Sequence, residues 1–387
     1  MTKMSKKELI KAIKPRYLKA SKKEKGKILD EFCKNTGYNR KYTIQIFKAG
    51  YDYGRVIREG RKVRKRKYSN EVILATIKVW ELLDYPCSTR LKASLIPTLQ
   101  SMINFKEVAI NGDILNKLLT ISARTLDRRM KRERQIRRLN RNRGTTRHGS
   151  LLKSSIPIRI TNWDTNKIGF MEMDTVAHNG GDPSGQFVYS LDMVEIYSGW
   201  SEQYAVLGKG EMGVVKAVDE VKNNLPFNLL GLDSDGGSEF INWHMVKYCN
   251  NNKLFFTRSR PDRKNDNAYV EQKNYTHIRK QLGYERLDTE EQLDAINNLY
   301  RNELRLFNNF FKPVMKIISK EKINNSVCRK KYDIPKTPYQ RLIEHSQITQ
   351  EKKEKLVKLY LSLNPVKLKR GIDEKTKKIK KLQQLTK

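Results

Sequence analysis

Acidic residues, cysteines and long apolar segments are all scarce in this chain of 387 residues. It has 42 aspartates and glutamates against 79 lysines and arginines, and its four cysteines lie far apart. None of them forms a C-x2-C pair, so a zinc ribbon or a disulfide-stapled fold is not expected. No segment approaches the roughly 20 apolar residues of a membrane span, and the lysine-bearing N-terminus lacks the apolar core of a secretory signal. We therefore expect a reduced, cytoplasmic protein that does not enter a membrane.

The excess of positive charge lies at the two ends of the chain. Residues 1–150 carry a net charge of +26 and residues 301–387 one of +16, whereas residues 151–300 are slightly acidic at −5. Clustered lysines and arginines bind polyanions because they displace the counterions condensed on phosphates. An amphipathic membrane anchor with Trp and Phe is not evident. The distribution favours nucleic acid as the partner, and a merely solubilising charge is the alternative.

Residues 25–50 have the pattern of a helix-turn-helix. A first helix has an apolar face that includes Phe32, Gly37 supplies a turn, and Asn39 can cap a second helix with Phe47 on its buried side. Any helical hairpin can show such a pattern, so the motif alone is weak. The side chains that it leaves for phosphates or base edges are Arg40, Lys41 and Gln45.

A second candidate helix-turn-helix covers residues 113–143. Leu118 belongs to its first helix, and Ser122 can cap the next helix, which packs through Leu126 and Met130. The alternative is one irregular helical domain with a single DNA-contacting surface. The arginines that could face a phosphate backbone or a groove are Arg124, Arg128, Arg129 and Arg132.

From about Gly169 the apolar periodicity changes from that of helices to that of strands. The order is strand, strand, strand, helix, strand, helix, strand, helix. Three consecutive strands followed by alternating helices predict a mixed α/β sheet covered by helices. The predicted strands are residues 169–176, 187–194, 198–206, 227–235 and 254–257, and the predicted helices are residues 211–223, 242–251 and 266–281.

Three acids stand at the functional ends of these elements. Asp174 ends the first strand, Asp235 follows the fourth in LDSDGGSEF, and Glu271 lies in the last helix in NDNAYVEQKN. Phosphodiester cleavage and strand transfer use two divalent ions about 4 Å apart, one on the attacking and one on the leaving oxygen. Mg²⁺ prefers hard oxygen ligands. Three carboxylates therefore suit this chemistry.

The segment 158–290 resembles the catalytic core of retroviral integrases and insertion-sequence transposases, the DDE group with a ribonuclease-H-like fold. The resemblance rests on the D-x-G-S-x-F pattern at Asp235, the 35 residues between Asp235 and Glu271, the N-x-x-x-E-x-x-N pattern at Glu271, and the R-P-x-x-x-N-D-N lead into that helix. It implies a ribonuclease-H-like mixed sheet and a transposase that cleaves and transfers DNA strands in integration and recombination. It also implies two Mg²⁺ ions, replaceable by Mn²⁺, with Asp174 as the bridging ligand.

Other polar residues near the three acids have less certain roles. Asn267, Glu271 and Asn274 share one helix face, so both asparagines are expected to contact the DNA end or to support the metal ligands. His178 follows the first acid and is either a substrate contact or a structural residue. Glu172 stands two positions before Asp174, and Asp233 stands two positions before Asp235. On a strand each would face the same side as the acid that it precedes. Each is therefore either a metal ligand or a structural residue.

The flanks resemble those of bacterial insertion-sequence transposases, because no His-His-Cys-Cys zinc module precedes the core. This resemblance implies a bacterial, nucleoid-associated protein that binds double-stranded DNA at the element ends and target, as a homodimer or higher oligomer on DNA. An apolar stripe of Leu356, Leu359 and Leu363 either contacts another subunit or packs within its own. The expected domains are a helix-turn-helix at 1–68, a second helical DNA-binding region with a basic linker at 69–150, the catalytic core at 158–290, and a basic helical region at 291–387.

Two other functions compete with the transposase. One is a non-catalytic DNA-binding regulator derived from a transposase, although a regulator need not keep three mutually repelling carboxylates together. The other is a ribonuclease-H-like nuclease acting on RNA–DNA hybrids, although helix-turn-helix flanks suit the grooves of B-form DNA.

Overall fold

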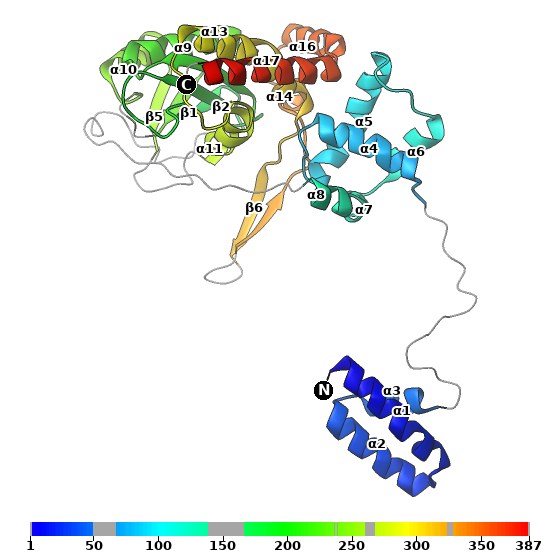
Figure 1. Ribbon diagram of the computed structural model, residues 1–387. Coiled ribbons are helices and arrows are strands. Elements are labelled where there is room, and N and C mark those ends of the chain that lie inside the picture. The colour runs from blue at the N-terminus through cyan, green and yellow to red at the C-terminus, as the bar shows by residue number, and fades with distance from the viewer. Residues whose placement is uncertain are drawn as a thin grey trace. The chain divides into compact units, whose positions relative to one another are not determined.

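A computed structural model of the chain describes residues 2–48, 67–137, 166–235, 237, 239–259, 268–322 and 328–385. The chain divides into two compact units, Met1–Lys67 and Tyr68–Lys387 (Figure 1). None of the described helices is both long enough and apolar enough to cross a membrane.

The first unit is a bundle of three helices. A capping box between Ser21 and Glu24 starts the second helix, and Gly37, at a φ of 70°, ends it in the left-handed conformation. The Asn39 side chain accepts the backbone N–H of Lys41 at 2.9 Å and so caps the third helix, as the sequence predicts. The helices are α1 (Lys3–Lys19), α2 (Lys22–Thr36) and α3 (Arg40–Phe47), and they bury Ile10, Ile28, Leu29, Phe32, Ile46 and Phe47.

The second unit opens with five helices. The Ser122 hydroxyl accepts the backbone N–H of Thr125 at 3.2 Å, so the predicted cap is present. Leu126 and Met130 are fully buried. The helices are α4 (Asn70–Leu82), α5 (Ser88–Asn104), α6 (Gly112–Thr120), α7 (Ala123–Arg129) and α8 (Lys131–Ile136). Residues 138–165, which include the basic linker, lie outside the described residues.

A five-stranded mixed sheet forms the centre of this unit. The spatial order is β3-β2-β1-β4-β5, with β1, β2 and β3 antiparallel and β1, β4 and β5 parallel. This is the ribonuclease-H-like arrangement that the resemblance implies. All eight residues of β2 are buried, because it lies inside the sheet with both faces covered. The strands are β1 (Phe170–Ala177), β2 (Val188–Glu195), β3 (Ser201–Leu207), β4 (Gly231–Ser234) and β5 (Phe255–Arg258).

Helices follow the strands in the predicted order. The predicted fourth strand is too long at its start. Residues 228–230 lie beside Gly169, and pairing with the neighbouring strands begins only at Gly231. A Cβ on Gly169, whose φ is 118°, would lie 2.5 Å from the backbone oxygen of Asn228, so only glycine fits this close approach. The helices are α9 (Glu211–Asn224), α10 (Trp243–Asn251), and a continuous helical stretch of α11 (Ala268–Lys273), the π-helix η1 (Asn274–Arg279) and α12 (Lys280–Leu282).

The C-terminal part is helical except for one hairpin that the sequence analysis did not predict. In the apolar stripe, Leu356 and Leu363 are buried within their own unit, whereas Leu359 is 38% exposed, so only part of the stripe packs within its own subunit. The elements are α13 (Glu290–Leu299), η2 (Tyr300–Leu304), α14 (Arg305–Phe311), the strands β6 (Ile317–Lys322) and β7 (Cys328–Tyr332), α15 (Pro338–Glu344), α16 (Gln350–Ser362) and α17 (Pro365–Leu385).

Candidate active site

The sheet brings two of the three candidate acids together. Parallel pairing of β1 with β4 sets Met173 beside Ser234, so the next residues, Asp174 and Asp235, lie side by side. The Asp174 carboxylate accepts the backbone N–H of Thr175 at 2.7 Å, and Asp235 Oδ1 accepts the backbone N–H of Gly237 at 3.0 Å. Each acid is therefore held by local backbone as well as by its strand.

The two carboxylates destabilise each other in their ionised forms. Burial and the neighbouring Asp235 carboxylate together raise the pKa of Asp174, whereas hydrogen bonds from Asn274 and Thr175 act in the opposite direction. A divalent cation between such oxygens removes the repulsion, and Mg²⁺ takes oxygen ligands of this kind. Asn274 Oδ1 is also buried and accepts no hydrogen bond from the described residues, which leaves one more oxygen beside the pair. The oxygen atoms of these side chains therefore suit a hard cation such as Mg²⁺ as ligands.

Glu271 lies on the helix that adjoins this pair but is not gathered into one cluster with it. Its side chain is exposed on α11, three residues before Asn274, whose Nδ2 donates a hydrogen bond to Asp174 Oδ2 at 2.6 Å. Residues three apart on a helix are neighbours, so Glu271 is on the face turned to Asp174. Among the described residues, no three His, Cys, Asp or Glu side chains lie close enough to hold one metal ion. Mutual repulsion of three carboxylates is a physical reason for this spacing.

Glu172 connects the strand of Asp174 to the helix of Glu271. Its side chain is only 1% exposed, and its Oε2 accepts the backbone N–H groups of Tyr269 at 3.0 Å and Val270 at 3.2 Å. The first N–H groups of a helix have no partner within the helix, so this carboxylate satisfies two of them. These contacts favour the structural interpretation of Glu172. Asp233, which accepts the hydroxyl hydrogen of Thr257 on β5, is structural in the same sense.

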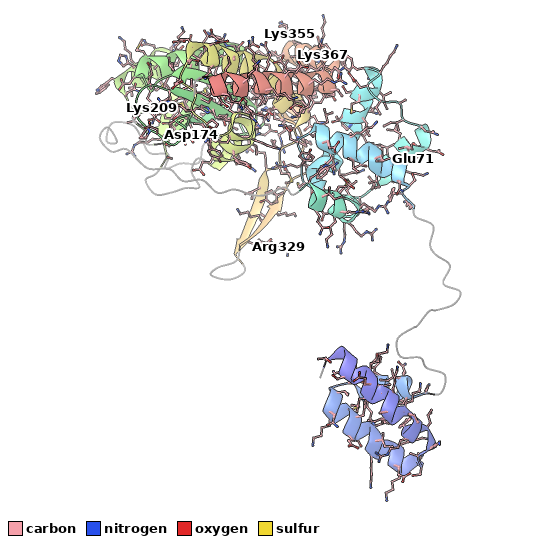
Figure 2. The ribbon with its side chains drawn as sticks, viewed as in Figure 1. Glu71, Asp174, Lys209, Arg329, Lys355 and Lys367 are labelled. Carbon is pink, nitrogen blue, oxygen red and sulfur yellow. The ribbon has the colours of Figure 1, made fainter. Side chains whose placement is uncertain are left out.

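A salt bridge that the sequence analysis did not anticipate borders the acids. Glu239 Oε1 accepts hydrogen bonds from Thr175 Oγ1 at 2.9 Å and from Lys209 Nζ at 3.2 Å. Thr175 follows Asp174 directly, and Figure 2 shows Lys209 and Asp174 in the same part of the sheet unit. Because Lys209 is half exposed, it places a positive charge at the edge of the site. The only sequence signal for Glu239 was its place four residues after Asp235.

Ionisable groups are also buried beside Asp174. Asp192 pairs with Asp174 across β1 and β2, is completely buried, and accepts a hydrogen bond from Gln203 at 2.8 Å. Burial raises the pKa of Asp192 to about 7 and lowers that of Lys273 to about 7. Sequence analysis missed these groups, because an acid within an apolar strand gives no sign of its partners.

His178 is a structural residue. Its ring is fully buried, and its Nε2 is 2.8 Å from the hydroxyl of Ser190. Burial, together with the positive charge of Arg279, lowers the pKa of His178 to about 3, so the ring is neutral at physiological pH. The alternative of a substrate contact at His178 therefore loses support.

The candidate DNA contacts are distributed over both units. On α3, Lys41 and Gln45 are exposed, and the exposed Arg40 forms an ion pair with Asp30. On α7 and α8 the arginines point outward to different degrees, and Asn267 lies outside the described residues. Exposed arginines are Arg124, Arg128 and Arg132, and Arg129 is half-buried.

Comparisons with known proteins give one sequence relative and several solved structures. No family model matches the chain. It is 35% identical over 335 residues to the uncharacterized protein y4rM of Sinorhizobium fredii (strain NBRC 101917 / NGR234), and the match covers 86% of this chain and 94% of that protein. The catalytic core domain of BIV integrase is 15% identical, with 45% of this chain and 93% of that chain covered and a TM-score of 0.30. The HTLV-2 integrase catalytic core domain in complex with magnesium is 14% identical, with 38% and 89% covered and a TM-score of 0.28.

Proposed function

The chain belongs to the family of the Sinorhizobium fredii protein y4rM, and we propose that it is a metal-dependent transposase that binds the ends of a mobile DNA element and cleaves and transfers DNA strands. The observation that carries the proposal is the convergence of Asp174 and Asp235 from adjacent parallel strands, beside the helix of Glu271. Two carboxylates that repel each other, one within β1 and one directly after β4 of a ribonuclease-H-like sheet, suit metal-dependent phosphodiester chemistry.

In this proposal Asp174, Asp235 and Glu271 are the metal ligands. Bound there, two Mg²⁺ ions, or Mn²⁺ in their place, would supply positive charge to the attacking and leaving oxygens of the phosphodiester. Asn274 orients the Asp174 carboxylate through its hydrogen bond, and Glu172 holds the start of the Glu271 helix. Supports of this kind commonly change metal affinity or activity by about 10–100-fold when removed.

The proposal assigns double-stranded DNA to the basic flanks. Exposed side chains on α3 and α7 present cations and an amide at helix surfaces, which is how helix-turn-helix proteins reach phosphates and base edges. The proposed contacts are Arg40, Lys41, Gln45, Arg124, Arg128, Arg129 and Arg132, together with Asn267 and Asn274 near the active site. Since a mobile element has two ends and one active site performs one transfer at a time, we propose assembly of two or more subunits on DNA.

A cleavage assay on a supercoiled plasmid that carries the element ends tests the proposal. With Mg²⁺ or Mn²⁺, the wild-type chain should nick and join these ends, whereas Asp174→Asn, Asp235→Asn and Glu271→Gln should each lose both reactions and still bind the DNA. Glu291→Gln, which removes an exposed acid on α13, is the matched control and should retain activity. Full activity in any triad variant would remove that residue from the site.

The same assay separates the alternatives. A wild-type chain that binds the ends and never cleaves them, with either metal ion, would be a DNA-binding regulator. Degradation of an RNA–DNA hybrid without cleavage of duplex DNA would identify a ribonuclease instead.

A further inference from the structure

The β6–β7 hairpin projects from the sheet and helices of its own unit, as Figure 1 shows. Its base is fixed by several contacts. Asp333 accepts the backbone N–H of Lys316 at 2.7 Å and pairs with Arg341 at 2.7 Å, and Val314 and Lys336 form a β-bridge. The hairpin is therefore an arm with a firmly attached base.

The charge on this arm is almost entirely positive. The two strands, IISKEK and CRKKY, contain five lysines and arginines and one acid, Glu321, which lies opposite Arg329. Arg329, Lys330 and Lys331 are exposed, and none of them forms an ion pair with another described residue. A bound polyanion would neutralise these three cations.

The positive charge lies on both faces of the ribbon. Side chains alternate along a strand, so Arg329 and Lys331 share one face and Lys330 is on the other. A flat anionic surface would contact only one of these faces. The walls of a DNA groove carry phosphates on two sides, and the major groove, about 12 Å wide, admits a two-stranded ribbon. Figure 2 shows Arg329 on this projecting hairpin.

Apolar side chains accompany the cations. Ile318 is 62% exposed and Tyr332 is 46% exposed, and both lie near the base of the arm. Within a groove, apolar groups contact sugars and thymine methyl groups. An arm with cations on both faces and apolar residues near its base therefore matches duplex DNA in both respects.

We propose that the β6–β7 hairpin is a DNA-binding arm that inserts into a groove of duplex DNA, with Arg329, Lys330 and Lys331 contacting phosphates. The inference rests on the proposed function for the identity of the partner. It adds a contact surface separate from α3 and α7, within a region for which the sequence predicted only helices.

The test uses the full chain with Arg329→Gln, Lys330→Gln and Lys331→Gln combined. The control removes the same charge from exposed lysines of α16 and α17, through Lys355→Gln, Lys358→Gln and Lys367→Gln. Fluorescence anisotropy of a labelled duplex is measured over a range of salt concentrations. Each lost phosphate contact lowers the slope of log affinity against log salt concentration by about 0.9. This slope should therefore fall by up to about 2.7 in the hairpin variant and by much less in the control.

Two results would overturn the inference. One is an equal change of slope in the hairpin and control variants. The other is weakened binding of a single-stranded oligonucleotide with unchanged binding of the duplex, which would contradict insertion into a groove. Circular dichroism of both variants checks that they remain folded, and Arg329→Lys alone should bind like the wild type. The cleavage assay is separate, so a chain that never cleaves DNA would refute the proposed function without touching this result.

Discussion

Asn274 Nδ2 donates a hydrogen bond of 2.6 Å to Oδ2 of Asp174, which lies on the first strand of the sheet. Asn274 is also the first residue of the π-helix η1, and such wide turns occur frequently at functional sites. The bond ties the helix of Glu271 to the strand of Asp174. It therefore links two proposed metal ligands through one amide.

We expect Asn274→Ala to lower the cleavage rate about 10–100-fold, because Asp174 loses the donor that orients it. The concentration of Mg²⁺ needed for half-maximal activity should rise, whereas affinity for element-end DNA should change little. Gln272→Ala, at an exposed position on the same helical stretch, is the control and should behave like the wild type. Unchanged metal dependence in Asn274→Ala would contradict an orienting role.

The second prediction concerns Glu172. Glu172→Ala leaves two N–H groups at the start of α11 without this acceptor, and for the buried N–H of Val270 the cost is about 1–3 kcal/mol. Hydrogen exchange of residues 268–273 should become faster, and the Mg²⁺ requirement for cleavage should increase. Glu172→Gln keeps one acceptor oxygen and should restore part of both properties.

Glu195 provides a matched control for Glu172. It is likewise a buried glutamate on a strand, and it accepts backbone N–H groups of Tyr197 and Ser198. Glu195→Ala should destabilise the fold without a specific change in metal dependence. If both variants shift the Mg²⁺ requirement equally, Glu172 stabilises the fold and does not position the helix.

The third prediction concerns the α4–α5 turn. Burial alone would raise the pKa of Asp84, but the ammonium groups of Lys312 and Lys369, each 2.8 Å away, hold it well below its usual range. A lowered pKa means that this carboxylate stabilises the fold above the unfolded-state pKa of about 3.9 and loses that effect as pH falls. Asp84→Asn should therefore lower the free energy of unfolding by about 3 kcal/mol at pH 7.

Urea unfolding at pH 7 and at pH 3 checks this prediction. The difference between the wild type and Asp84→Asn should shrink at pH 3, where the unfolded chain already binds a proton at Asp84. A difference of the same size at both pH values would show that the ion pairs are not its source.

The sequence predicted the central sheet well because the relevant signals are local. Apolar alternation and turn residues placed all five strands of the sheet, and the spacing of Asp235 and Glu271 pointed to the candidate site. The contacts that support the site are not local. Glu172 meets Val270 98 positions away, and Asn274 meets Asp174 100 positions away. Neither separation leaves any pattern in a single sequence.

The hairpin was missed for a different reason. The sequence KIISKEK lacks clear alternation, and its lysines and glutamate resemble the Lys-rich helices that follow in α16 and α17. Strand formation there depends on pairing with residues 328–332 and on the anchoring of Asp333 by Arg341. Contacts between segments decided the structure where local preference did not.

The last prediction concerns the first unit and separates two kinds of DNA contact on α3. Lys41 is exposed and carries a charge, so Lys41→Ala should weaken binding to all duplexes and lower the log–log salt slope by about 0.9. Gln45 is exposed on the same helix and has an amide that can read a base edge. Gln45→Ala should therefore cost about 1–3 kcal/mol on element-end DNA and almost nothing on random DNA.

Lys11→Ala, at an exposed position on α1, removes the same charge as Lys41→Ala away from the proposed recognition helix and should change the slope less. Anisotropy titrations of the full chain with end and random duplexes give both quantities. Equal losses for Gln45→Ala on the two duplexes would mean that α3 contacts the backbone without reading the sequence. Equal slopes for Lys41→Ala and Lys11→Ala would mean that α3 is not the DNA-facing helix of this unit, because a phosphate contact depends on where the charge lies as well as on how much there is.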